Sequence, residues 1–121
     1  MIPQHEQVQR GPQPDLPPPL VVDGPERLEI LHTALQNVSR LAVDTESNSL
    51  YAYRERVCLI QLSTDQADFL LDPLAFDGAM SLTFLGNIFA DPGVEKVLHA
   101  AEYDVMVLRR DFDFRFANIF D

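Results

Sequence analysis

The spacing of apolar residues changes along this chain, and that change constrains the fold more than any other feature. Between residues 25 and 39, leucine and valine recur every three or four positions, which predicts a first helix. Three short apolar runs follow at 40–46, 57–62 and 67–72, each bounded by polar residues and suited to a strand. A helical period followed by strand-like runs predicts a protein of the α/β class.

The second half of the chain alternates between helix and strand. We expect a helix over 79–90, a strand over 96–99, a helix over 100–112 and the opening of another strand over 116–121. The strands 57–62 and 67–72 are separated by a short turn and should pair antiparallel. The expected architecture is a mixed sheet with flanking helices. The last apolar strand has nothing after it to cover the sheet, so we expect the domain to be truncated.

Prolines divide the chain into a leader and a domain. Seven of the nine prolines lie in residues 1–25, and proline removes backbone donors that sheets and helices need. We therefore expect residues 1–24 to form a disordered leader and 25–121 to form the ordered domain. A role of the leader as a ligand for a proline-binding module stays open. The segment Asp23-Gly24-Pro25-Glu26 is typical of a helix start, with proline and a carboxylate in the first turn.

Composition limits the classes of function. A chain of 121 residues forms one small domain. Its net charge of −10 argues against gripping nucleic acid by phosphate neutralisation, unless metal ions or a basic region elsewhere supply the counter-charge. One cysteine excludes an internal disulfide framework. No stretch has the length and apolarity of a signal peptide or membrane span, so a reducing cytosol is the expected compartment.

Three carboxylates carry the chemical signal. Asp44 and Glu46 stand two residues apart at the end of an apolar strand, so both side chains should lie on one face and share a cation such as Mg²⁺ or Mn²⁺. The alternative is a strand end that runs into solvent. Asp104 lies in the first turns of the helix after the strand 96–99 and could point towards the first strand. The alternative for Asp104 is an acid placed there by the helix dipole alone.

Two segments resemble a known family when they are taken together. The stretch LAVDTESNSLYAYRERVCLIQLS, followed by KVLHAAEYDVMVLRRDF, resembles the ribonuclease D branch of the DEDD 3′–5′ exonucleases. Asp44 and Glu46 match the first family motif, Asp-x-Glu, and His99 with Asp104 matches the second, His-x-x-x-x-Asp. The resemblance implies a ribonuclease H-like fold and hydrolysis of nucleic acid from its 3′ end. RNA is implied in preference to DNA, with two ions of Mg²⁺ or Mn²⁺ and no small-molecule cofactor.

The resemblance also implies roles for particular residues. Asp44, Glu46 and Asp104 would be the catalytic, metal-binding carboxylates, and Leu50 would contact the terminal base, unless it is a loop residue folded onto the core. The third family motif, Tyr-x-x-x-Asp, does not occur in these 121 residues, so we expect this chain alone to show little or no turnover. Two alternatives stay open: a non-catalytic nucleic-acid-binding module with a degenerate exonuclease fold, and an unrelated α/β domain.

Overall fold

The computed structural model describes residues 16–48, 55–76 and 79–121. Its centre is a six-stranded sheet in the order β1-β4-β3-β2-β5-β6. The strands are β1 (Leu20–Val22), β2 (Arg40–Asn48), β3 (Arg56–Ser63), β4 (Asp68–Leu71), β5 (Glu95–Leu98) and β6 (Ile119–Phe120). The helices are α2 (Pro25–Leu35), α3 (Thr83–Ala90) and α4 (Ala101–Phe112), and two 3-10 turns, η1 (Pro73–Ala75) and η2 (Ala79–Leu82), precede α3.

The sheet is mixed, as the sequence predicts. β2 pairs antiparallel with β3, and β3 pairs antiparallel with β4. β1 runs parallel to β4, β2 parallel to β5, and β5 parallel to β6. The carboxyl ends of β2, β5 and β6 therefore meet at one edge of the sheet, and open α/β sheets bind their ligands at the carboxyl ends of their strands. The predicted α/β class is confirmed.

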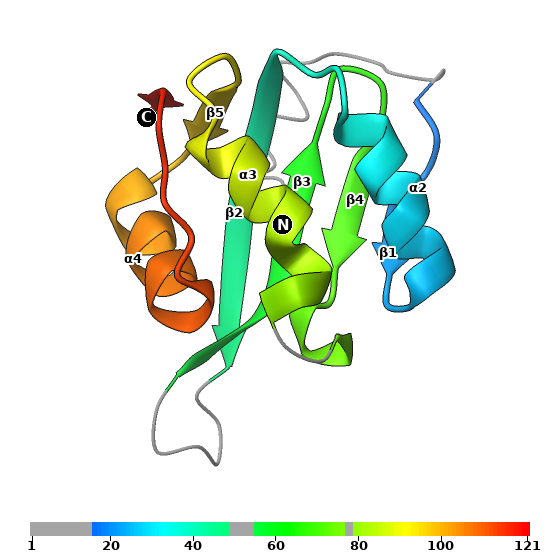
Figure 1. Ribbon diagram of the computed structural model, residues 1–121, viewed down its shortest axis with the longest axis horizontal. Helices are drawn as coiled ribbons and strands as arrows, with labels where there is room; N and C mark the ends of the chain where they lie inside the picture. Colours follow the sequence, from blue (N-terminus) through cyan, green and yellow to red (C-terminus); the bar gives the residue numbers. More distant parts are fainter. Residues whose placement is uncertain (1–15, 49–54, 77–78) are drawn as a thin grey trace.

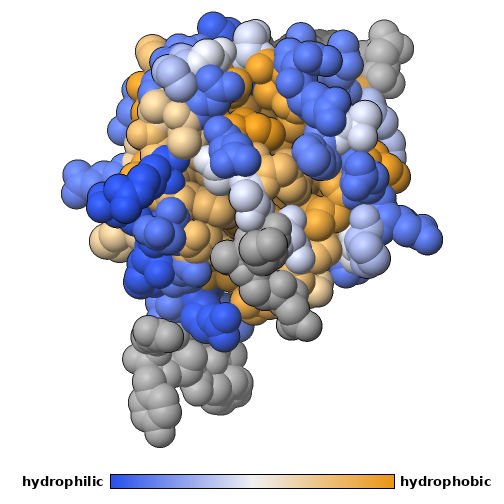
Figure 2. Space-filling model, viewed as in Figure 1, coloured by the Kyte–Doolittle hydropathy of each residue, from blue (hydrophilic) through white to orange (hydrophobic). Residues whose placement is uncertain are grey.

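One face of the sheet carries the core. Alternate residues of β2, Leu41 and Val43, are buried on this face, and α2 and α3 cross it in front of the strands (Figure 1). Leu31 of α2 and Phe89 of α3 are fully buried within the same cluster. In the same view, Figure 2 shows apolar surface across the middle, where α3 lies, and hydrophilic surface around the rim. The opposite face of β2 is more exposed and carries the acidic residues of that strand.

The domain begins earlier than the sequence analysis expects. Residues 20–22 lie within the predicted leader 1–24, yet they form strand β1 at the edge of the sheet. Val22 is fully buried, and its carbonyl accepts a hydrogen bond from the Asp72 amide at 3.0 Å. The boundary at residue 25 is therefore wrong, because three apolar residues directly after the proline run are free to pair. Residues 1–15 of the predicted leader lie outside the described part of the chain.

The ends of two predicted helices also differ. The first helix begins at Pro25, as expected, but ends at Leu35 rather than at 39, and Gly24 is its N-cap. The predicted helix 79–90 begins as a 3-10 turn and becomes an α-helix only at Thr83. Helix ends depend on local capping more than on apolar spacing, which explains why the periodicity placed the elements but not their ends.

Candidate active site

Asp44 and Glu46 lie on the polar face of β2, near the end of that strand. Opposite them on β3 lie Gln61 and Leu59, in regular antiparallel register, so the two carboxylates share a face as predicted. Asp44 is half-buried, and one of its oxygens, Oδ1, accepts the Thr45 amide at 3.0 Å. Glu46 is exposed. A β-bulge directly after Glu46 interrupts the ladder, and such bulges redirect side chains next to active sites.

A strained turn brings α4 to the same edge. β5 ends at Leu98 and α4 begins at Ala101, so only His99 and Ala100 join them. Ala100 adopts a left-handed conformation with φ 61° and ψ 54°, which few residues with a side chain adopt. This conformation reverses the chain at once, and it places the first turns of α4 beside the carboxyl ends of β5 and β2.

Asp104 is buried at the contact between α4 and β2. Only 3% of its surface is exposed. The hydroxyl of Thr45 donates a hydrogen bond of 2.6 Å to Asp104 Oδ1, which joins the first motif of the sequence to the second. The other oxygen, Oδ2, is also buried and has no hydrogen-bond partner among the described residues. A buried carboxylate oxygen without a partner is costly in a folded protein, and it commonly marks the place of an ion, a water or a catalytic role.

The charges around Asp104 make its ionised form more costly still. Burial raises the pKa of Asp104, and the hydrogen bond from Thr45 opposes that rise. The negative charges of Asp44 and then Asp121 raise the pKa further, while His99 lowers it. Asp44 and Asp104 therefore act on each other electrostatically. Carboxylates that repel one another are stabilised by a cation placed between them.

These residues suit a divalent cation in chemistry, and the described chain supplies part of a ligand set. Asp104 offers its Oδ2, which has no partner within residues 16–48, 55–76 and 79–121, and Asp44 lies within electrostatic reach. Carboxylate oxygens are the ligands that Mg²⁺ prefers. In the described ranges, no group of three or more His, Cys, Asp or Glu side chains is arranged to hold a metal ion. Metal binding by Asp44, Glu46 and Asp104 together stays a prediction.

The structure adds residues that the sequence analysis missed. Thr45, the middle residue of Asp-x-Glu, was passed over, although it continues the buried face of Leu41 and Val43 with a hydroxyl. Gln61 is buried opposite Asp44, and its Oε1 has no partner among the described residues. A polar side chain at a buried position of a strand was the available signal for both.

Two other predicted features have different outcomes. Leu50, the predicted contact for the terminal base, lies outside the described residues, so its role stays a prediction. His99 is exposed at the end of β5 and acts on the charge of Asp104. Among the described helices, none combines the length and the apolarity needed to cross a bilayer.

The fold and the site together define a class of protein. A mixed α/β sheet with acidic residues on its central strand and on the helix after β5 is the arrangement expected of a ribonuclease H-like nuclease. A scan against family models agrees with this class. Residues 19–121 match the model described as a 3′-5′ exonuclease. The chain belongs to this exonuclease family, and its resemblance to the ribonuclease D branch is confirmed.

Curated relatives of this chain include several RRP6 proteins. It is 40% identical over 100 residues to "Protein RRP6-like 3" of Arabidopsis thaliana, with 83% of this chain and 11% of the relative covered. It is 36% identical to "Exosome complex component 10 homolog" of Caenorhabditis elegans, with 86% and 12% covered. It is 35% identical to "Exosome complex exonuclease RRP6" of Saccharomyces cerevisiae, with 85% and 14% covered. The chain therefore spans only about an eighth of the length of these relatives.

Solved structures give the same result for the fold. The catalytic core of RRP6 from Trypanosoma brucei is 36% identical, with a TM-score of 0.77, and the match covers 86% of this chain and 28% of that one. Escherichia coli RNase D is 27% identical, with a TM-score of 0.75, and 87% of this chain and 27% of that one are covered. The predicted fold is confirmed, and the chain corresponds to part of these catalytic cores.

Proposed function

We propose that this chain is part of a divalent-metal-dependent exonuclease that removes nucleotides from the 3′ end of RNA. Asp44, Glu46 and Asp104 would hold the Mg²⁺ or Mn²⁺ ions. The observation that carries the proposal is the bond between Thr45 and Asp104, because it joins the two family motifs and leaves a buried carboxylate oxygen that has no partner among the described residues. Most buried polar side-chain atoms in folded proteins have a hydrogen-bond partner, so this oxygen supports a role for Asp104 in binding an ion.

RNA is the proposed substrate because of the relatives. The yeast relative is named an exosome complex exonuclease, and Escherichia coli RNase D is described as an exoribonuclease involved in structured RNA processing. Each of these two proteins is more than 25% identical in sequence to this chain, over more than 80% of its length. Nothing in the described residues or in the comparisons favours the non-catalytic alternative. The cytosolic location stays a prediction.

The roles of the residues follow from their positions. Divalent ions bound at these carboxylates would supply activation of the attacking water and stabilisation of the leaving oxygen in phosphodiester hydrolysis. Asp44 and Glu46, on one face of β2, would hold the ions from the sheet, and Asp104 would hold them from α4. Thr45 fixes the orientation of Asp104 by donating to its Oδ1. Bound cations would also offset the net charge of −10 where the phosphates approach.

Metal binding by the chain is the first test. Calorimetric titration with Mn²⁺ compares the wild type with Asp44→Asn and Asp104→Asn, which keep the side-chain shapes and remove one charge each. We expect the wild type to bind and both variants to bind at least tenfold more weakly. Equal binding by all three proteins, or no binding by the wild type, contradicts the proposal.

Trimming of RNA is the second test. The chain is incubated with Mn²⁺ or Mg²⁺ and a 5′-labelled RNA with a free 3′ end, next to DNA of the same sequence. We expect little or no shortening, because these 121 residues contain no Tyr-x-x-x-Asp and general acid–base assistance is typically worth 10²–10⁴ in rate. Stepwise shortening that Asp44→Asn abolishes would confirm the exonuclease and refute the need for that third motif in this chain.

A further inference from the structure

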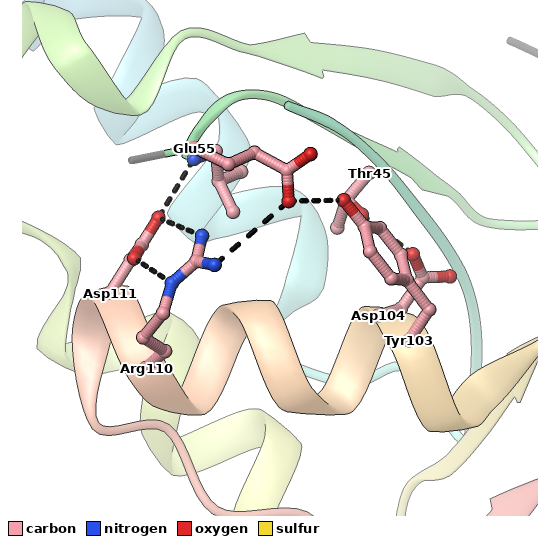
Figure 3. A network of polar contacts seen from close by, with 7 residues as sticks. Thr45, Glu55, Tyr103, Asp104, Arg110 and Asp111 are labelled. Atoms are coloured by element: carbon pink, nitrogen blue, oxygen red, sulfur yellow. Dashed lines mark hydrogen bonds and ion pairs between the residues drawn. The ribbon is translucent and has the colours of Figure 1, made fainter. Parts of the chain in front are cut away.

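A network of polar contacts joins α4 to the start of β3. Figure 3 shows its members, Glu55, Tyr103, Arg110 and Asp111, which we call the α4 network. The Tyr103 hydroxyl donates to Glu55 Oε1 at 2.7 Å, and Arg110 Nη1 lies 3.9 Å from the same oxygen. Arg110 Nε donates to Asp111 Oδ1 at 2.7 Å. Asp111 Oδ2 in turn accepts the backbone amide of Val57 at 2.7 Å.

The ends of the network lie next to the candidate carboxylates. Tyr103 directly precedes Asp104 on α4. Glu55 directly precedes β3, whose first residues pair with the end of β2, where Ser47 lies opposite Val57. The network therefore runs from the helix that carries Asp104 to the ladder that carries Glu46.

The pairing of β2 with β3 is irregular in that region. The bulge after Glu46 leaves Cys58 as an extra residue on β3, because Glu46 pairs with Leu59 and Ser47 with Val57. The backbone pairing is locally disrupted at a bulge, so the strand has less support from its neighbour there. Contacts from α4 are then needed to fix where the end of β2 lies relative to the helix.

Three polar contacts along α4 meet this need. Near the start of the helix, Asp104 accepts a hydrogen bond from Thr45, and the neighbouring Tyr103 donates one to Glu55. At the far end of the helix, Asp111 accepts a hydrogen bond from the Val57 amide. Burial by itself raises the pKa of Asp111, but the hydrogen bonds from Arg110 and from the Val57 amide bring that pKa below its ordinary value. Asp111 is therefore ionised at neutral pH and accepts strongly.

The contact between Tyr103 and Glu55 adds little to folding stability by itself. Tyr103 is 41% exposed, and its hydrogen bond to Glu55 is solvent-accessible. Exposed polar contacts contribute little to the free energy of unfolding. Their geometric effect is larger, because a metal site loses affinity when its ligands are held even slightly out of place.

We propose that Tyr103 and Glu55 are positioning residues, which fix α4 against the β2–β3 ladder so that Asp104 keeps its place relative to Asp44 and Glu46. This inference rests on the proposed function, since it assigns the two residues to the same metal site. The contact is between side chains, so it can be removed one hydroxyl or one carboxylate at a time.

The test measures Mn²⁺ affinity and thermal unfolding of the full chain. Tyr103→Phe removes only the hydroxyl, and Glu55→Ala removes its acceptor. Both should weaken Mn²⁺ binding about tenfold, the lower end of what substitutions just outside a metal's own ligands cost. Glu55→Gln keeps an oxygen that accepts from Tyr103, so it should retain most of the affinity. The unfolding midpoint of all three variants should stay close to that of the wild type.

Arg109→Gln is the matched control, because Arg109 lies beside the network on α4 and is exposed. It should leave Mn²⁺ affinity unchanged. Wild-type affinity in Tyr103→Phe, or equal loss in Glu55→Gln and Glu55→Ala, overturns the positioning role. A wild type that binds no Mn²⁺ overturns the proposed function and the positioning role together. Equal binding by the wild type and Tyr103→Phe, with loss in Asp44→Asn, overturns the positioning role alone.

Discussion

Replacing Asp104 by asparagine should stabilise the metal-free protein. The wild-type residue is 3% exposed, its Oδ2 has no partner in the described part of the chain, and its charge is repelled by Asp44 and Asp121. Asparagine has nearly the same shape and carries no charge, and its Oδ1 can still accept the Thr45 hydroxyl. The substitution therefore removes an unfavourable charge and keeps the favourable bond.

The size of the effect follows from the burial. Leaving a buried polar group without a partner costs about 1–3 kcal/mol, and more when the group is charged. Part of this cost remains, because the new amide has its own donor to satisfy. We expect Asp104→Asn to raise the free energy of unfolding by about 1–2 kcal/mol at neutral pH, which corresponds to roughly 4–8 °C in midpoint.

The sign of the pH dependence adds a second check. The pKa of Asp104 is raised in the folded chain, so its contribution to stability is fully present below the pKa of the unfolded state and is lost as pH rises through the folded value. The advantage of Asp104→Asn should be small in acid and should grow across that window. The charge of His99 acts on the same group, so the comparison includes His99→Gln in both backgrounds.

Urea denaturation in the presence of a chelator measures these differences. The matched control is Glu102→Gln, which also removes a negative charge from the first turn of α4, but at an exposed position. Loss of a favourable helix-dipole interaction should destabilise that control by about 0.3–1 kcal/mol. A metal-free Asp104→Asn that is less stable than the wild type at neutral pH refutes the reasoning.

Three further substitutions test other parts of the account. Ala100→Gly should stabilise the chain by about 0.5–1 kcal/mol in urea denaturation, because glycine adopts the left-handed conformation of φ 61° without cost from a side chain; a loss of stability would show that the turn is not strained. Gly86→Ala should destabilise it by about 1–3 kcal/mol, since the new Cβ would lie 2.9 Å from the ring of Phe114, and Phe114→Leu should reduce that loss; additive effects of the two changes would contradict the clash. Burial lowers the pKa of Lys96, and the negative charge of Asp91 opposes this shift. Between the lowered pKa and the usual 10.5, the unfolded chain binds more protons than the folded chain, so the free energy of unfolding should rise with pH. Lys96→Met should remove this rise, and an unchanged pH profile would contradict it.

The sequence predicted the order of the elements because their apolar spacing is clear. The central strand, the helix that carries Asp104 and the antiparallel pair of β3 and β4 all lie where periodicity and turn residues predicted them. Strand β1 was missed because three apolar residues next to a proline run carry too little pattern to be distinguished from a leader. Its burial depends on pairing with β4, which is a tertiary contact.

The sequence predicted the carboxylates of the candidate site but not the residues that contact them. Asp44, Glu46 and Asp104 stand out because together they match the motifs Asp-x-Glu and His-x-x-x-x-Asp in the expected order. Thr45 does not stand out, since threonine is common in strands. Tyr103 does not stand out either, because it is a single aromatic residue within a helical pattern. Their roles come from partners that are distant in sequence, 59 positions away for Thr45 and 48 for Tyr103. The spacing of residues along the chain does not predict such contacts.

The central claim is that Mn²⁺ binds where the carboxyl end of β2 meets the start of α4. Adding Mn²⁺ in small steps to isotopically labelled chain, and following the amide resonances by NMR, tests this directly, because a paramagnetic ion broadens the signals nearest to it. Broadening should begin at Asp44, Thr45 and Asp104, should leave α2 unaffected at the same Mn²⁺ concentration, and should disappear in Asp44→Asn. Broadening that begins elsewhere, or that persists unchanged in Asp44→Asn, would contradict the account.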